Sequence, residues 1–306
     1  MDFRLTPEQT GFAQSLGELM SKADSVAAAR AWADGDHDPG LTLWKRLAEQ
    51  GVTALVAPED KGGLGGTLVD LVVAFEVLGH HLAVGPWIES AALAPQVDGD
   101  LVTVAVAEVA PYALDADVVR LLHGVAGEQV RSVDTTRRLF AVDSPATYDD
   151  AALDRAALAA AAQLLGCGER LLADSVEYVK QRKQYGRTIG SYQAIKHQLA
   201  DVRIALDFAR PLVLGAALTA ASRDVSAAKV AAGDAAYLAS RVALQVHGAI
   251  GYTAEFDLGL WINRVRALVG AWGTTSYHRG RIAATLVEER AQRASRRARN
   301  HAEGRF

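Results

Sequence analysis

The sequence predicts a mainly helical fold in three parts: an N-terminal helical domain over residues 1–97, a reduced β region over 98–148 and a C-terminal four-helix bundle over 149–306. Three observations lead to this prediction. Apolar residues recur at helical spacing in both end regions of the chain. Short runs rich in β-branched residues, separated by turn residues, occupy the middle. Alanine enrichment after residue 149 suits close packing of long antiparallel helices.

The N-terminal part begins with a clear helix start. Thr6 is a favoured N-cap residue, Pro7 suits the first helical position, and Gln9 supports the first turn. Two more helices are expected, over residues 41–50 and 67–80. The glycine-rich run between them, residues 57–66, predicts a tight loop rather than regular structure.

The residue pattern changes in the middle region, where short runs rich in β-branched residues replace the helical spacing of apolar residues. Four runs are expected to form strands of a small sheet that closes near Ser144 and Pro145. These runs cover residues 101–106, 118–122, 128–133 and 137–142.

The C-terminal part is expected to hold four helices. The first starts near residue 149 and stops near Gly186, and Ser191 is expected to cap the second. The third covers residues 226–246, and the last starts at Thr274. Short connections between long helices indicate an antiparallel bundle.

Composition excludes several classes of protein. A formal net charge of −4 over 306 residues argues against a general nucleic-acid binder. No secretory signal is visible, and no apolar run is expected to cross a bilayer, so we expect a cytoplasmic protein without a membrane segment. The single cysteine, Cys167, excludes an internal disulfide and a cysteine-based metal site, and we expect it in the core.

Two segments, residues 182–193 and 245–255, carry residue types that suit a nucleotide ligand. Arg182 beside a glycine turn offers a forked, permanently charged donor to a pyrophosphate. Glutamine offers a donor and an acceptor to a ribose or adenine edge. Gly248 and Gly251 let a backbone approach a ligand closely.

Ordinary structural roles compete with these assignments. Arg182 could cap a helix end, and Gln245 could be a surface amide. His247 fits packing better than acid–base chemistry. Arg264 with Glu255 could form an ion pair that fixes the loop. Trp261 and Trp272 are expected to be packing residues.

In this order the two segments, followed by Arg264 and the pair Gly273-Thr274, resemble the C-terminal domain of acyl-CoA dehydrogenases. The N-terminal helices and the glycine-rich loop are similar to the first domain of that family. The resemblance implies FAD as cofactor, bound mainly by a neighbouring subunit and gripped by these segments. The cofactor contacts that it implies are Arg182, Gln184, Tyr185, Gln193, Gln245, Gly248 and Thr274.

The catalytic base of the family has no counterpart here. Such enzymes need a carboxylate within reach of the proton alpha to the thioester carbonyl. The resemblance places it just before Gly-Thr, where this chain has Trp272, and residues 258–287 contain no Asp or Glu. Some members carry it on the first long C-terminal helix, at the position of Ala156. Asp154 is the nearest carboxylate, but two residues of helix turn it about 200° away.

The flavin-ring cradle of the family's middle domain is also not recognisable. The chain therefore looks similar to the shortened small subunit of actinobacterial heterotetrameric acyl-CoA dehydrogenases that act on steroid-derived CoA thioesters. This resemblance implies a homologous full-length partner that supplies the glutamate, and an acyl-CoA substrate. Two alternatives stay open: a non-enzymatic scaffold or regulatory subunit, and a flavin oxidase or monooxygenase with the same fold.

Overall fold

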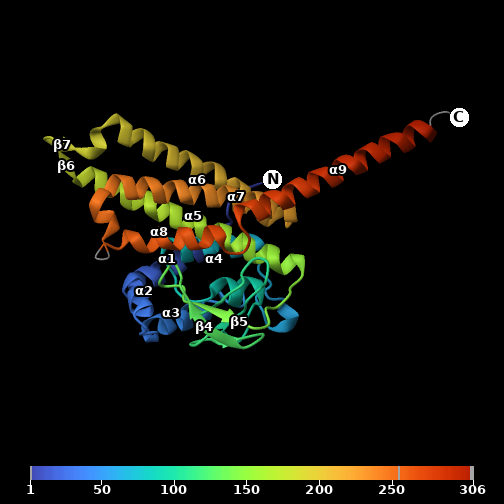
Figure 1. Ribbon diagram of the computed structural model, residues 1–306, viewed down its shortest axis with the longest axis horizontal. Coiled ribbons are helices and arrows are strands. Elements are labelled where there is room, and N and C mark those ends of the chain that lie inside the picture. Colours follow the sequence, from blue (N-terminus) through green and yellow to red (C-terminus); the bar gives the residue numbers. More distant parts are fainter. Residues whose placement is uncertain (1, 254–255, 304–306) are drawn as a thin grey trace.

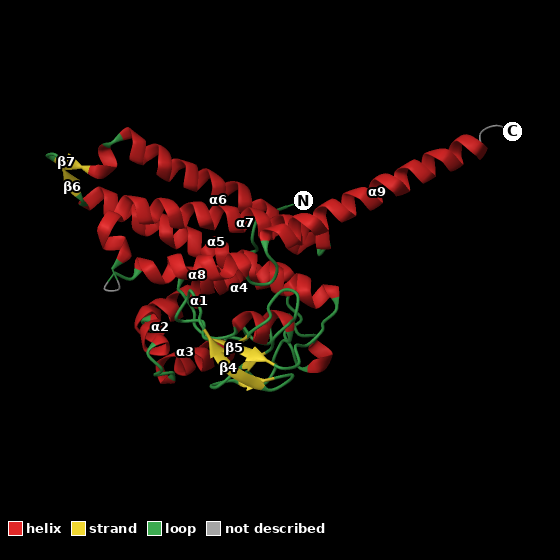
Figure 2. Cartoon of the chain, viewed as in Figure 1, coloured by secondary structure: helices red, strands yellow, loops and turns green. Residues whose placement is uncertain are grey.

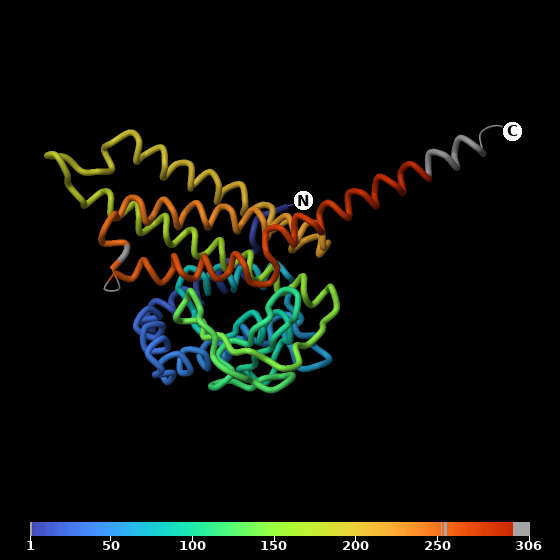
Figure 3. The backbone as a smooth tube through the Cα atoms, in the orientation of Figure 1, coloured from blue at the N-terminus to red at the C-terminus, as the bar shows by residue number. Residues whose placement is uncertain are grey.

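The computed structural model describes residues 2–253 and 256–303. Helices dominate it, and they form two layers. The N-terminal helices and the small sheet lie together on one side of the long C-terminal helices (Figures 1 and 2). The chain path shows the same division: apart from the first few residues, which run up beside the bundle, the segments up to about residue 148 lie below it (Figure 3). The predicted mainly helical fold is confirmed.

The N-terminal helices start where their caps allow. Thr6 accepts a hydrogen bond from the backbone N–H of Gln9, and the Gln9 side chain accepts one from the backbone N–H of Thr6. Thr67 and Asp70 form the same reciprocal cap. The glycine-rich loop contains only a one-turn 3-10 helix, η1. The elements are α1 (Pro7–Lys22), α2 (Ser25–Ala33), α3 (Asp38–Glu49), η1 (Glu59–Lys61), α4 (Leu68–His80) and a single π-helical segment, η2 (Ile88–Leu93).

The middle region is a reduced sheet, as expected. A three-stranded antiparallel sheet has the order β2-β5-β4, and β1 pairs with β3 in parallel. All five strands are short, so most of this region is loop. The strands are β1 (Val102–Thr103), β2 (Ala113–Leu114), β3 (Arg120–Leu121), β4 (Ala126–Val130) and β5 (Leu139–Val142).

The C-terminal part is built around α5, which packs against α4, α6, α7 and α8. Only the first part of α9 lies against the body, and the rest extends away from it (Figure 1). The elements are α5 (Asp150–Gln181), β6 (Lys183–Gln184), β7 (Arg187–Thr188), η3 (Ile189–Ser191), α6 (Gln193–Thr219), α7 (Ser222–His247), η4 (Gly248–Tyr252), α8 (Leu258–Gly270) and α9 (Thr275–Glu303).

Two expectations for this part need correction. The first helix ends at Gln181 rather than near Gly186, because Arg182 turns to an extended conformation and starts a hairpin. Ser191 does not cap α6; its hydroxyl donates to the carbonyl of Thr188, and α6 begins after Tyr192 without a side-chain cap. The sequence patterns also did not single out α2 and α8.

The membrane expectation changes in one respect. Helix α5 is long and apolar enough to cross a bilayer by length and composition, but 83% of its most apolar window is buried inside the protein. Burial on this scale is typical of a core helix. Cys167 lies in this core, fully buried, and burial raises the pKa of its thiol to about 12.

Candidate functional site

The hairpin after α5 displays the first of the two sequence motifs. Tyr185 and Gly186 are its two central residues, with φ of 50° and 80°. Two central residues with positive φ are typical of the tight turn that matches the twist of a two-residue hairpin. The hairpin lies at one end of the bundle (Figure 1), and the Tyr185 side chain at its tip is 95% exposed.

The second motif forms the opposite wall of a groove of about 760 Å³, which we call the hairpin groove. Helix α7 ends at His247, and Gly248 adopts φ 62° and ψ −136°, a conformation open essentially to glycine alone. A Cβ at Gly248 would have no described atom within 4 Å, so the backbone there is open to a ligand. The groove is lined by, among others, Tyr178, Arg182, Gln184, Tyr185, Gln245, His247 and Gly248.

The structure thus brings together five of the seven expected cofactor residues and separates one. Gln193 is the first residue of α6, between the groove residues Tyr192 and Ala194. Thr274 instead precedes α9, where its hydroxyl accepts a hydrogen bond from the backbone N–H of Tyr277. The turn between α8 and α9 lies near the middle of the molecule, away from the hairpin (Figure 1).

His247 adds a polar atom to the groove. Its Nδ1 lies 2.7 Å from the carbonyl oxygen of Ala243, so Nδ1 donates the proton. Burial lowers the pKa of His247, which leaves the ring neutral and Nε2 an acceptor. Among the described residues this buried Nε2 has no hydrogen-bond partner. The ring stacks on Tyr178 at 4.2 Å, so the expected packing role holds as well.

The two positions where the family's base is expected hold no carboxylate. Trp272 is 1% exposed and Ala156 is fully buried in α5. The carboxylate of Asp154 has a structural role, because it accepts hydrogen bonds from Arg281, at 2.6 Å, and from Ser222. Trp272 and Ala156 thus offer no basic group at these positions, and the carboxylate of Asp154 is already bound by Arg281 and Ser222.

One carboxylate that the motifs do not single out lies beside Trp272. Glu89 of η2 is 2% exposed, and its Oε2 has no hydrogen-bond partner in the described chain. Burial raises the pKa of Glu89 to about 7, with Arg137 opposing the rise. Glu89 and Trp272 line a hollow of about 270 Å³, the sheet pocket, between η2, the small sheet and the end of α8. The only signal in the sequence is a lone carboxylate inside the apolar run of residues 87–93.

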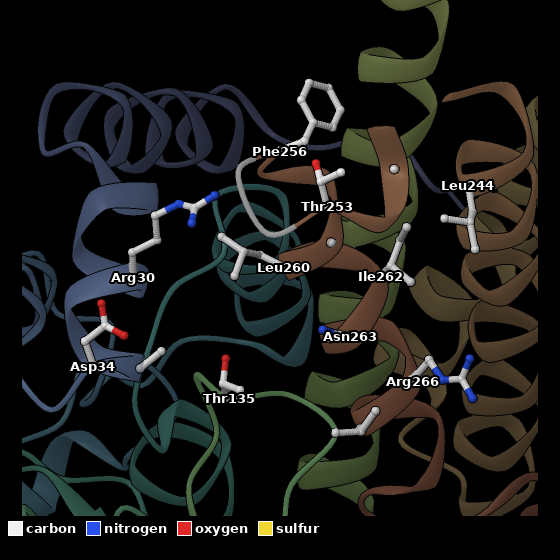
Figure 4. Close-up of a pocket in the computed structure, with 14 residues that line it drawn as sticks. Arg30, Asp34, Thr135, Leu244, Thr253, Phe256, Leu260, Ile262, Asn263 and Arg266 are labelled. Carbon is white, nitrogen blue, oxygen red and sulfur yellow. The ribbon is translucent and has the colours of Figure 1, made fainter. Parts of the chain in front are cut away.

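A further hollow of about 640 Å³, the α8 pocket, continues along α8 (Figure 4). Arg30 comes from α2, Asp34 directly follows that helix, and Leu260 and Asn263 come from α8. Arg30 pairs with Asp257 at 2.6 Å. Val133 lines both this pocket and the sheet pocket, so the two are neighbours along the helix. Among the residues that the structure describes, no cluster of three His, Cys, Asp or Glu side chains could hold a metal ion.

Arg264 of α8 makes three buried hydrogen bonds next to Val133, the residue that lines both pockets. Its guanidinium donates to Asp134 at 2.6 Å, to Thr136 at 2.7 Å and to the carbonyl of Ala83 at 2.8 Å. Arg264 and Asp134 are each 1% exposed. The structural role expected for Arg264 holds, but its ion-pair partner is Asp134; Glu255, the expected partner, lies outside the described residues.

Comparison with known proteins gives concordant results. Residues 147–287 match the model of the acyl-CoA dehydrogenase C-terminal domain, and residues 6–99 match that of the N-terminal domain. Acyl-CoA dehydrogenase IpdE2 of Mycobacterium tuberculosis is 31% identical over 293 residues, which cover 85% of this chain and 92% of that protein.

Two solved structures share the fold. The ChsE4-ChsE5 complex from Mycobacterium tuberculosis has a TM-score of 0.80 at 22% identity, covering 94% of this chain and 99% of the matched chain. A structure described as the Tcur3481-Tcur3483 steroid ACAD G363A variant has a TM-score of 0.76 at 22% identity, covering 93% and 99%.

Proposed function

The chain belongs to the acyl-CoA dehydrogenase family, and on that premise we propose that it is the smaller subunit of a two-component, FAD-dependent acyl-CoA dehydrogenase. The reaction is the α,β-desaturation of an acyl-CoA thioester. In this proposal the hairpin groove completes an FAD site of a homologous full-length subunit, and that partner supplies the catalytic glutamate. The observation that carries the proposal is the convergence of both motifs on one groove.

The groove offers the donor and acceptor set that FAD requires. Arg182 provides a permanent positive charge for the pyrophosphate, and Gln184 and Gln245 provide amides for ribose or adenine edges. The exposed ring of Tyr185 offers a face for stacking. The unpartnered Nε2 of His247 accepts a hydrogen bond from a ligand hydroxyl or amino group. When bound, FAD supplies the redox chemistry of the reaction.

The need for a partner follows from the missing base. Trp272 and Ala156 hold the two expected positions, and Asp154 is committed to Arg281. Desaturation requires a base within hydrogen-bond reach of the substrate proton. A second subunit with that glutamate supplies what these positions lack.

An apolar stripe on α6 supports association with a partner. Ile204, Phe208 and Leu212 follow one another at four-residue intervals, which places them on one helix face. Their side chains are 52%, 73% and 47% exposed. Exposed contiguous apolar surface of this kind marks interaction sites. ChsE4-ChsE5 is a complex of two chains, and we propose a heterotetramer for this protein as well.

The substrate class in this proposal is a CoA thioester of a bulky, steroid-derived acid. Its support is the likeness to IpdE2 and to the structure described as a steroid ACAD.

The change Arg182→Ala tests the flavin role in the co-purified complex. Loss of a charge-assisted donor to the pyrophosphate should weaken FAD binding by about tenfold or more. The measurement is FAD content per complex from its absorption spectrum after gel filtration. Lys183→Ala is the matched control, because Lys183 is the adjacent exposed cation and is not among the residues that line the groove.

Unchanged FAD content in Arg182→Ala would favour the scaffold alternative, for which the buried Trp272 at the base position is the supporting observation. Product analysis under air separates the remaining alternative. Enoyl-CoA is the expected product, whereas peroxide or a hydroxylated product would indicate an oxidase or monooxygenase.

A further inference from the structure

The sheet pocket contains polar groups that the proposed flavin site does not use. It is lined by Glu89 of η2, Leu114 of β2, Leu139 of β5, Trp272 at the end of α8, and Arg131 and Arg137. Leu114 and Trp272 are buried, Leu139 is half-buried, and Arg131 is exposed at the rim. The lining is mainly apolar with a few convergent polar groups, as is typical of small-molecule sites. Its volume, about 270 Å³, is near the lower end for such sites.

Three of these polar groups make no side-chain hydrogen bond within the described residues. Glu89 Oε2 and Trp272 Nε1 are buried without a hydrogen bond. The Arg137 side chain is 8% exposed and donates no described hydrogen bond; burial lowers its pKa, and the carboxyl groups of Glu89, Asp134 and Asp115 oppose that shift. A buried guanidinium that donates no hydrogen bond and a buried N–H without an acceptor are both costly, so each is normally satisfied by protein, water or ligand.

The backbone at Trp272 is strained and held in place. Its φ is 58°, which bulky residues rarely adopt. The carbonyl of Trp272 accepts a hydrogen bond from His278 at 2.9 Å, and Lys229 donates to the carbonyl of Gly273 at 3.4 Å. The backbone N–H of Gly273 also donates to the carbonyl of Val109. Strain that the surroundings maintain is concentrated at functional sites, and here it keeps the indole in the pocket wall.

We propose that the sheet pocket binds a compact apolar carboxylic acid as its anion. The carboxylate accepts hydrogen bonds from Arg137 and Trp272, and the apolar body packs against Leu114 and Leu139. Arg137 and Trp272 bring only donors, so the ligand must bring acceptor oxygens. A carboxylate is the acceptor that best matches a guanidinium in charge and geometry. This site is separate from the hairpin groove, and the two assignments can fail independently.

Glu89 makes this binding depend on pH. The charged groups near it are Arg137, which opposes the rise in its pKa, and Asp115, which adds to it. Arg131 contributes a positive charge at the rim. Burial raises the pKa of Glu89 to about 7 and that of Asp115 to about 6. An ionised Glu89 repels a bound carboxylate, so affinity should fall as the pH rises through about 7.

The test uses 3-cyclohexylpropanoate as the probe and 3-cyclohexylpropanamide as its neutral match. Both are titrated by calorimetry into the full chain, or into its complex with the partner if the two co-purify. We expect saturable binding of the carboxylate, and binding of the amide weaker by about tenfold or more.

The change Trp272→Phe keeps an aromatic ring but removes the N–H donor, and it should weaken carboxylate binding by about tenfold. Arg279→Ala, an exposed arginine of α9 paired with Asp234, should leave binding unchanged.

Glu89→Gln provides a second measurement that keeps side-chain size. Its carboxylate affinity should stay level between about pH 6.5 and 8.5, where the affinity of the unmodified chain falls. The proposal is overturned by the absence of saturable binding, by equal affinity for the amide, or by an unchanged affinity in a folded Trp272→Phe variant. FAD content of the same preparations reports on the hairpin groove alone. Loss of FAD with retained probe binding would therefore count only against the flavin proposal.

Discussion

Buried polar residues at the sheet pocket destabilise the folded state in a way that apolar core residues do not. Glu89, Arg137 and Trp272 are all buried; Glu89 Oε2 and Trp272 Nε1 have no described hydrogen-bond partner, and burial lowers the pKa of Arg137. Elsewhere in the core the same residue types are paired: Arg264 is bonded to Asp134, and Trp261 donates to the carbonyls of Gly79 and His80.

We therefore expect Glu89→Gln to stabilise the folded protein above neutral pH. The pKa of Glu89 is about 7 in the folded state and 4.5 ordinarily, so its protonated form contributes stability below about pH 4.5 that is lost as the pH rises through 7. Glutamine is neutral throughout and avoids this loss. Its free energy of unfolding at about pH 8 should exceed that of the unmodified chain by roughly 3 kcal/mol. Urea denaturation at about pH 4.5 and pH 8 measures the difference.

The control is Glu288→Gln, which removes an exposed carboxylate from α9 and should change stability by less than about 0.5 kcal/mol at either pH. Equal stability of Glu89→Gln and the unmodified chain at about pH 8 would mean that Glu89 is paired or hydrated in solution.

Among the elements, the contact between α4 and α5 holds the N-terminal helices against the C-terminal bundle. The two helices approach so closely that glycine is required at their contact. A Cβ on Gly166 would lie 1.9 Å from the carbonyl oxygen of Glu76, and one on Gly79 would lie 2.1 Å from that of Gln163. Close approach at small residues joins the N-terminal layer to the bundle. It also places η2, which follows α4, against the end of α8.

Gly166→Ala should therefore destabilise the protein by at least about 2 kcal/mol, because the backbone of α4 cannot move aside as a side chain could. Gly11→Ala in α1 is the opposite case, since a Cβ there meets no described atom within 4 Å. That variant should gain about 0.5–1 kcal/mol from the lower backbone entropy of the unfolded chain. Thermal unfolding of both variants checks the pair, and similar effects in the two would refute the close-crossing argument.

Local signals explain which elements could be predicted from the sequence. The start of α1 was readable because its cap, Thr6 with Gln9, is encoded within four residues. The hairpin after α5 was not predicted, because the helical spacing was extended to near Gly186, whereas Tyr185 and Gly186 both adopt positive φ at a tight turn. Helix α2 was not, because it is only nine residues long and its cap residue, Asp24, is left-handed. The sheet pocket was not predictable either, since Glu89, Arg137 and Trp272 are distant in sequence and meet only through packing.

At the scale of the whole molecule, three features lie on exposed surface. The hairpin groove opens at one end of the bundle, α6 exposes an apolar stripe, and α9 extends away from the body (Figure 1). The middle region, by contrast, is reduced to short strands and loops. This distribution suits a subunit that adds a wall to another chain's site, and it does not suit a subunit that encloses a flavin alone.

The most direct test of this account is the flavin content and dehydrogenase activity of the chain purified alone, compared with the same chain co-expressed with a homologous full-length subunit. The chain alone should be colourless and inactive toward acyl-CoA thioesters. The complex should be yellow and should reduce an electron acceptor with formation of enoyl-CoA. A yellow chain that oxidises an acyl-CoA by itself would contradict the two-component proposal.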